Sequence, residues 1–486
     1  MRLVPSALLA ATALLLGGCF NTSTEAAADD RISVAMLLPP RSGLSPFSDD
    51  AFKLSRWSTA ETLVTLDADG VAQPALATAF TQVDPLTWSF DIRAGVTFHD
   101  GATVDPGAVV TALTAATKAV PKPRILDGVD LTIRADGQKV LVSTPDPDPL
   151  LPQRLSSPQL SILSPAAYGT TVNPVGRGTG PFRLIEANTS TARLDRFDGY
   201  WGGAAKLAGI DVSFVPDGTA RAAALRTGTA DVVEAVPVSQ AGLLDAGQVF
   251  EVPMPRTNTL YLNTSKGAFK DAAVRGAARE AIQREPIVTN VYEGRADVAE
   301  GLLGPALPWA ENRDTAVYPE KSGKGVGEIV LATFTDRAEL PEVAVQLQQQ
   351  LEKAGFTVRQ EIREYAQIEA DALAGEFDAF ILSRATVLDS GDPVAYLYSD
   401  FACEGSFNIA QLCDPAVDAA LKTASETAAG TERQKAILAA EKLILQTGAA
   451  VPLLHERVVQ GESGDFTGVE RDSRERLLIT AETAPR

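Results

Sequence analysis

The sequence predicts an α/β protein built from two lobes. Short segments with the alternating pattern of strands and longer segments with helical spacing interleave along the chain, without the fixed repeat of a solenoid. The length of 486 residues is enough for two large lobes that each bury a core. Apolar extended runs at 259–262 and 451–455 are where we expect the chain to cross between lobes. This division gives three parts, namely lobe I over 31–258, lobe II over 259–455 and a return to lobe I over 456–486.

The N-terminal segment predicts export. Arg2 precedes an apolar run over 7–16 that is too short to span a bilayer as a permanent helix. The run ends in Leu-Gly-Gly-Cys at Cys19, which resembles the lipobox of bacterial lipoproteins, in which the cysteine is acylated after cleavage. We therefore expect residues 1–18 to be a signal peptide, Cys19 to carry lipid, and 19–30 to tether the protein to the extracytoplasmic face of the cell membrane. The alternative is a buried cysteine at the end of an N-terminal strand.

Two further cysteines, Cys403 and Cys413, lie ten positions apart. Disulfides persist in the oxidising compartments that exported proteins reach, so an even pair predicts a disulfide between them. Two free buried thiols remain the alternative.

Lobe I is expected to begin its regular structure with hairpins. Residues 87–93 alternate apolar and polar side chains, and the turn that follows predicts pairing with 96–98. Asp105 and Pro106 predict the start of a helix that reaches about Lys118, because Asp caps free amides and Pro fits the first helical turn. The remaining expectations are a hairpin of 131–133 with 140–142, strands at 182–185, 192–195 and 210–214, and a helix at 219–226.

Lobe II has a more helical pattern. Helical spacing predicts four helices, over 271–283, 341–354, 414–427 and 432–446. Between them, short apolar segments indicate strands of a second sheet at 325–333, 357–362 and 377–382.

Composition argues against several functions. The chain has 43 Lys+Arg against 62 Asp+Glu, a net charge of −19 that repels phosphate backbones, so nucleic acid is not an expected partner. Two histidines and three cysteines leave little material for metal or thiol chemistry, and the common catalytic spacings are absent. We expect no catalytic residues, no metal site and no cofactor. Plentiful carboxylates keep a lipid-anchored hydrolase open as an alternative.

Several separated motifs occur in a characteristic order along nearly the whole chain that follows the tether. They are Glu61-Thr62-Leu63-Val64, Asp69-Gly70, Pro74-Ala75-Leu76-Ala77, Trp88-Ser89-Phe90-Asp91-Ile92-Arg93, Phe98-His99-Asp100-Gly101, Gly178-Thr179-Gly180-Pro181-Phe182, Asp198-Gly199-Tyr200-Trp201 and Phe269-Lys270-Asp271. Together they resemble family 5 solute-binding proteins of ABC importers, the oligopeptide, dipeptide and nickel group. The resemblance implies a two-lobed, periplasmic-binding-protein-like (type II) fold, with an extra subdomain in lobe I at about 71–170. It also implies a binding protein that serves membrane permease subunits and performs no catalysis, and we expect a monomer.

The segment after Phe380 resembles the peptide-binding branch of that family. In that branch an aspartate accepts the α-ammonium of the peptide, and an upstream arginine meets the carboxylate of a short peptide. Asp389 matches the aspartate, and Arg384 lies near the arginine, one residue closer to the aspartate. Thr386 stands where the family has a tryptophan. The ligand main chain would pair, as an added strand, with the backbone of Ala385, Thr386, Val387 and Leu388.

The sequence therefore predicts a lipid-anchored receptor that captures short peptides in a cleft between its lobes and passes them to an ABC permease. Nickel or metallophore complexes and oligosaccharides remain alternative ligands. For Asp389 the structural alternative is a turn cap beside Ser390-Gly391, and for Arg384 it is a surface or interlobe ion pair.

Overall fold

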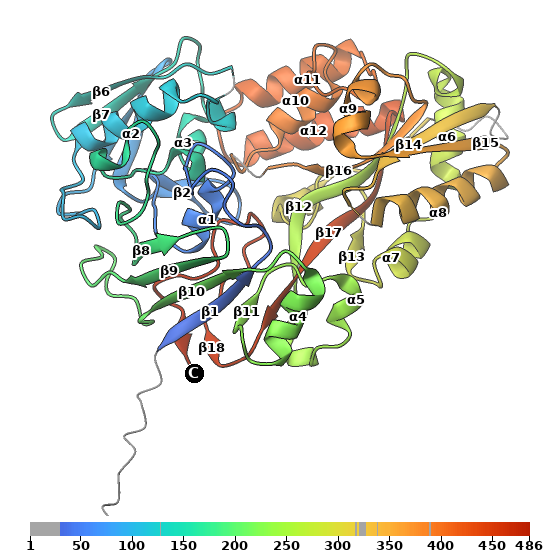
Figure 1. Cartoon of the computed structure of the whole chain (residues 1–486). Coiled ribbons are helices and arrows are strands. Elements are labelled where there is room, and N and C mark those ends of the chain that lie inside the picture. The colour runs from blue at the N-terminus through green and yellow to red at the C-terminus, as the bar shows by residue number, and fades with distance from the viewer. Residues whose placement is uncertain (1–29, 127, 316–317, 320–326, 338, 388–389) are drawn as a thin grey trace, which may run out of the picture.

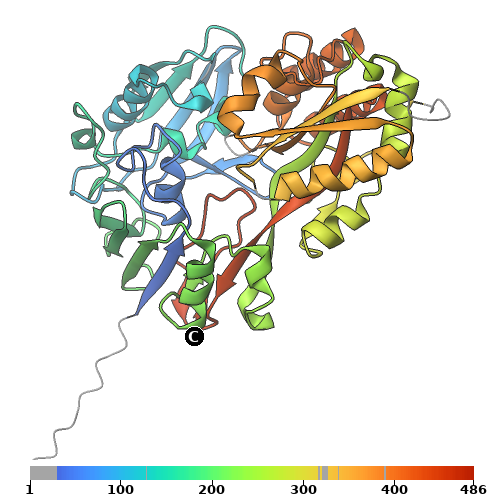
Figure 2. The ribbon, with the colours of Figure 1, turned by 45° about the vertical axis from the view of Figure 1, so that its right-hand side comes forward.

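Two long strands, β12 (Val249–Leu262) and β17 (Ala450–Glu462), pair antiparallel and connect the two halves of the molecule (Figure 1). They run side by side from one half to the other in both views (Figure 2). Their register shifts between Pro253 and Thr257 and again between Asn258 and Thr259. The predicted lobe boundaries at 258/259 and 455/456 fall inside these strands. The computed structural model describes residues 30–126, 128–315, 318–319, 327–337, 339–387 and 390–486.

Lobe I is built on β1, which pairs parallel with β10 on one side and β11 on the other. β11 in turn pairs with β17, so the C-terminal part of the chain completes this lobe. Its strands are β1 (Arg31–Met36), β8 (Phe182–Ala187), β9 (Thr191–Arg196), β10 (Gly209–Phe214), β11 (Val232–Val233), and the pair β18 (Phe466–Thr467) and β19 (Ala484–Pro485). Its helices are α1 (Ala51–Arg56), α4 (Gly218–Arg226) and α5 (Val238–Ala241), with short 3₁₀ turns at Pro165–Ala167 and Ala246–Gln248.

A four-stranded antiparallel sheet in the order β4-β5-β7-β6 forms a subdomain beside lobe I, within the predicted region of about 71–170. Its strands are β4 (Ala77–Asp84), β5 (Thr87–Ile92), β6 (Thr132–Asp136) and β7 (Lys139–Ser143), preceded by the small hairpin of β2 (Val64–Leu66) and β3 (Ala72–Pro74). α2 (Pro106–Lys118) and α3 (Leu151–Arg154), with 3₁₀ turns at Arg124–Leu126 and Pro158–Leu160, complete it. Buried apolar residues from Leu63 to Ile162 form its own core.

In this subdomain, two predictions from the local sequence are confirmed and one is wrong. The helix begins as predicted, because the Asp105 side chain accepts a hydrogen bond from the Ala108 amide at 2.8 Å and Pro106 occupies the first turn. The hairpin of 132–136 with 139–143 also forms. The predicted hairpin of 87–93 with 96–98 is wrong, because β5 pairs with β4 and β7 instead. Residues 96–98 form no strand, and Thr97 makes a single bridge to Thr103.

Lobe II packs helices around the other end of the sheet, where β16 pairs antiparallel with β12 and parallel with β14. Its strands are β13 (Ala296–Val298), β14 (Glu328–Phe334), β15 (Thr357–Arg363) and β16 (Ala379–Ala385). Its helices are α6 (Ala272–Ala281), α7 (Glu285–Val291), α8 (Glu339–Lys353), α9 (Tyr365–Leu373), α10 (Val394–Phe401), α11 (Pro415–Glu426) and α12 (Thr431–Thr447), with 3₁₀ turns at Ala268–Lys270 and Pro308–Asn312. The lobe has a separate core that extends from Leu260 to Leu454.

A disulfide joins Cys403 to Cys413 in the connection between α10 and α11, as the sequence predicts. Cys19 lies outside the described residues, as do the predicted signal peptide and most of the predicted tether. Among the helices of the described ranges, none combines the length and the apolarity that crossing a membrane requires.

Candidate ligand cleft

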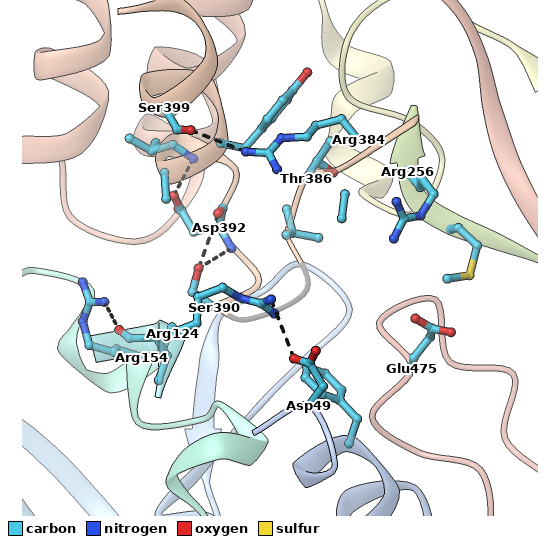
Figure 3. Close-up of a pocket in the computed structure, with 18 of the residues that line it drawn as sticks. Asp49, Arg124, Arg154, Arg256, Arg384, Thr386, Ser390, Asp392, Ser399 and Glu475 are labelled. Carbon is cyan, nitrogen blue, oxygen red and sulfur yellow. Dashed lines mark hydrogen bonds and ion pairs between the residues drawn. The ribbon is translucent and has the colours of Figure 1, made fainter. Parts of the chain in front are cut away.

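A cleft of about 2590 Å³ lies between the lobes, and its lining comes from lobe I, the subdomain, lobe II and a C-terminal loop (Figure 3). Pockets for small molecules typically have volumes of about 300–1,000 Å³. The cleft is therefore large enough for an extended solute of several residues. Charged side chains project into it from both lobes, which is unlike a uniformly apolar small-molecule pocket.

The predicted ligand segment lies in the wall of this cleft. Arg384, Ala385, Thr386 and Val387 all line it, whereas Leu388 and Asp389 lie outside the described residues. β12 pairs with one edge of this segment, and the Thr386 amide donates a hydrogen bond of 2.8 Å to the Pro255 carbonyl.

The other edge of β16 has a strand partner only at its beginning. β14 pairs with β16 at Ala379 and Phe380 only. Within the described part of the chain, the backbone from Ser383 onwards therefore has no strand on that side. An extended peptide is the kind of ligand that adds to such an edge.

Arg384 is paired inside lobe II. Its guanidinium donates to both oxygens of Asp400, with Nη2 2.9 Å from Oδ1 and Nε 3.0 Å from Oδ2. Burial disfavours the charged form, but the Asp400 carboxylate outweighs it and raises the pKa of Arg384. The cation also lies over the ring of Phe407, 4.3 Å from its centroid. Only part of the Arg384 side chain, 28% of its surface, faces the cleft.

A second buried arginine fixes the loop that follows β16. Arg433 on α12 donates to both oxygens of Asp392, at 2.7 and 3.0 Å. The same guanidinium donates to carbonyls at the end of α11, including those of Ser425 and Thr427. Arg433 therefore links Asp392 both to α12 and to the end of α11.

Sequence reasoning missed a cluster of charges nearer the crossing strands. Arg256 on β12 and Arg337 share the carboxylate of Glu456 on β17, with N–O distances of 3.7 and 3.1 Å. Ser383 also donates its hydroxyl to Glu456. Burial, and then the neighbouring charge of Arg337, lower the pKa of Arg256. Two cations that share one anion leave a positive excess that suits a ligand carboxylate. The available signal was an arginine three residues before the apolar run at 259–262.

Lobe I contributes its own charges to the cleft. Arg56 on α1 donates to Glu234, and this pair is buried. Burial opposes ionisation of Glu234, but Arg56 outweighs it and holds the pKa of that carboxyl below its usual range. Glu475, on the C-terminal loop between β18 and β19, also lines the cleft, and burial raises its pKa. Sequence reasoning missed Glu475 because a run of alternating charges is typical of a solvated loop.

Both histidines are structural in this fold. The His99 ring donates from Nε2 to the Gly180 carbonyl at 2.8 Å, and His455 bonds to the Thr257 hydroxyl through Nδ1 at 2.9 Å. Burial lowers the pKa of each to about 4. Among the described residues, no group of three or more His, Cys, Asp and Glu side chains is placed to hold a metal ion.

Two lobes on crossing strands, with a charged cleft between them, define a binding protein that encloses its ligand. The model of the bacterial extracellular solute-binding proteins, family 5 Middle, matches residues 71–408. The chain belongs to this family and is a solute-binding protein of an ABC importer, with the two-lobed type II fold. Its homologues are solute-binding proteins rather than enzymes.

Relatives of known ligand or structure agree with this assignment. The glutathione-binding protein GsiB of Salmonella paratyphi A is 27% identical over 431 residues, which cover 83% of this chain and 84% of GsiB. The crystal structure of a nickel ABC transporter from Bacillus halodurans superposes with a TM-score of 0.81, at 27% identity over 93% of this chain and 99% of that one. HbpA2 of Haemophilus parasuis shares the fold, with a TM-score of 0.82 at 20% identity over 94% of this chain and 100% of its own.

Proposed function

We propose that the solutes this receptor captures are short peptides. The observation that carries the proposal is the edge of β16 from Ser383 onwards, which lines the cleft and lacks a strand partner among the described residues. Main-chain pairing on such an edge is available to any peptide, because every peptide offers the same amides and carbonyls. GsiB, named for binding glutathione, a tripeptide, supports a ligand of this class.

The charges of the cleft suit a zwitterion. A peptide enclosed between lobes loses water at both ends, so each terminal charge needs an opposite partner. Asp389, matched by sequence, is proposed to accept the α-ammonium. Arg384 is proposed to contact the carboxylate while remaining paired to Asp400, and Arg256 with Arg337 forms a second candidate for that end.

We further propose that the protein works from the outer face of the cell membrane, anchored through lipid on Cys19. A Cys19→Ala variant should lose labelled fatty acid and leave the membrane fraction. Equal palmitate incorporation in the variant and the parent would refute the anchor.

A peptide panel followed by calorimetry tests the ligand class. A ligand that binds the folded form raises stability by RT ln(1 + [L]/Kd), about 2.7 kcal/mol at a hundredfold excess over Kd. Short peptides should therefore raise the melting temperature. If none does, and a nickel–histidine complex or an oligosaccharide does, the peptide proposal is wrong.

One substitution then tests the proposed ammonium site. Asp389→Asn keeps the side-chain shape and removes the charge. Binding of a peptide with a free α-ammonium should therefore weaken by about 2–5 kcal/mol, the usual cost of breaking a buried charge pair. N-acetylation of the peptide should weaken binding to the parent and do little further harm in the variant. Glu426→Gln, in the same cleft but on an exposed ion pair with Lys422, is the matched control. Equal affinity of variant and parent for both peptides would make Asp389 structural.

A further inference from the structure

The loop between β18 and β19 contains a turn that presents one side chain to the cleft. The carboxylate of Asp472 accepts hydrogen bonds from the backbone amides of Arg474, Arg476 and Leu477 at 2.9, 2.8 and 3.1 Å. Glu475 stands at the tip of this turn with φ +54°, in the left-handed region that side chains other than glycine rarely occupy. Such a conformation persists only where the surroundings enforce it, and it is most frequent at functional sites.

The residues on either side of Glu475 supply that enforcement. Arg474 donates to the Ala68 carbonyl in the β2–β3 turn, and Arg476 donates to the backbone and side chain of Ser156 at 3.1 and 3.0 Å. Both arginines are buried, and Ser55 of α1 bonds to the Arg476 carbonyl. The neighbours of Glu475 are thus anchored in lobe I and the subdomain, while Glu475 itself lines the cleft.

The carboxylate of Glu475 has no hydrogen bond or ion pair with any residue that the structure describes, although the side chain is half-buried. In Figure 3, Glu475 points from its loop towards the side of the cleft on which Arg256 lies. The nearby cation Arg56 is already engaged by Glu234, and Arg256 shares Glu456 with Arg337. Burial raises the pKa of Glu475, and the nearby charges of Arg56 and Arg256 offset this rise only in part.

We propose that Glu475 is a ligand-contacting residue that receives a basic side chain of the bound peptide. The inference rests on the proposed function and adds a preference for peptides that carry lysine or arginine at one position. Lobe I then supplies an anion for the side chain, and the α-ammonium keeps the partner given under the proposed function. The rival explanation is an interlobe ion pair of Glu475 with Arg256, formed when the lobes approach without any role for ligand charge.

The test compares lysine with norleucine, which has a similar chain length and no charge, at each position of a tri-alanine peptide. Calorimetry on the full protein should show that lysine binds at least tenfold tighter than norleucine at one position. Glu475→Gln should abolish that ratio, and Glu475→Asp should retain part of it. Glu426→Gln, on an exposed and paired carboxylate of the same cleft, should leave the ratio unchanged.

Three outcomes would overturn the inference. In the first, the parent protein binds the lysine and norleucine peptides equally well at every position. In the second, Glu475→Gln retains the preference for lysine. In the third, Glu475→Gln weakens the binding of both peptides by the same factor, and Arg256→Gln has the same effect. The last result identifies the interlobe ion pair when the double variant Glu475→Gln, Arg256→Gln binds both peptides no more weakly than either single variant does. If no peptide of any composition binds the parent, the proposed function itself fails, and this inference fails with it.

Discussion

Asp400 is the counter-charge of Arg384, and it is completely buried, with 0% of its side chain exposed. Besides the guanidinium, it accepts a hydrogen bond of 3.1 Å from the hydroxyl of Tyr261 on β12. The pair ties the cleft end of β16 to α10 and to the crossing strand. A ligand carboxylate that reached Arg384 would therefore meet a cation already oriented by the protein.

Removal of the Asp400 charge should destabilise the protein strongly. Asp400→Asn leaves the Arg384 cation without its anion in a largely buried site, and breaking such a pair typically costs about 3–5 kcal/mol. Denaturant unfolding measures the loss. Glu426→Gln, which removes an exposed pair with Lys422, should cost less than about 1 kcal/mol. Equal losses in the two variants would show that the buried pair contributes no more than the exposed one.

The two lobes touch through glycines beside the predicted ligand loop. Gly70, in the β2–β3 turn of lobe I, and Gly391, in the loop after β16, both have positive φ, of +80° and +70°. A Cβ on Gly70 would lie 2.9 Å from the Gly391 carbonyl oxygen, closer than real Cβ contacts allow. This approach of backbone to backbone leaves no room for a side chain when the lobes are together.

Gly70→Ala should therefore hinder closure. Gly137→Ala is the matched control, since Gly137 also has positive φ, +58°, but an added Cβ meets nothing within 4 Å. Both variants should lose about 1 kcal/mol of stability through backbone strain. Only Gly70→Ala should also weaken peptide binding, by roughly tenfold if pushing the lobes apart costs about 1.4 kcal/mol. Calorimetry and small-angle scattering with and without peptide measure the two effects. An affinity equal to that of Gly137→Ala would show that the glycine contact does not limit closure.

The disulfide should stabilise lobe II. It closes a short connection between α10 and α11, for which the chain-entropy estimate gives about 2–3 kcal/mol. A Cys403→Ser, Cys413→Ser double variant should lose that much free energy of unfolding, and a reducing agent should affect the parent but not the variant. A parent that unfolds identically with and without reductant would contradict this contribution.

Elements with a complete local signal were predictable from the sequence. The α2 helix has its cap, its proline and its apolar face within fourteen residues, and the β6–β7 hairpin is closed by a turn of its own. The Cys403–Cys413 pair required only a count and a short spacing. In each case the interacting residues lie close together along the chain, so the local sequence determines the structure with little contribution from tertiary contacts.

Elements whose partners lie far away were not predictable in the same way. β12 contains Pro253, Pro255 and Arg256 near its middle, which argue against a central strand, and its register with β17 is irregular there. Most residues of β4 are exposed, and apolar and polar residues alternate little along it. The local sequence therefore did not predict that β4 pairs with β5. The cleft charges Arg256 and Glu475 are 219 positions apart in the sequence and line the same cleft only because β12 and the C-terminal loop converge there.

The two buried histidines should make stability depend on pH below neutrality. Each has its pKa lowered to about 4 in the folded state, whereas an unfolded histidine titrates at about 6.5. Between those values the unfolded chain binds more protons, so the free energy of unfolding falls as the pH falls from about 6.5 to about 4. Each histidine should account for about 3 kcal/mol of that loss. Because carboxylates also titrate towards the lower end, the measurement is the difference between parent and His99→Gln in denaturant unfolding across this range. The variant should lose less stability than the parent on acidification, and parallel curves for the two proteins would show that His99 takes up its proton in the folded state as readily as in the unfolded chain.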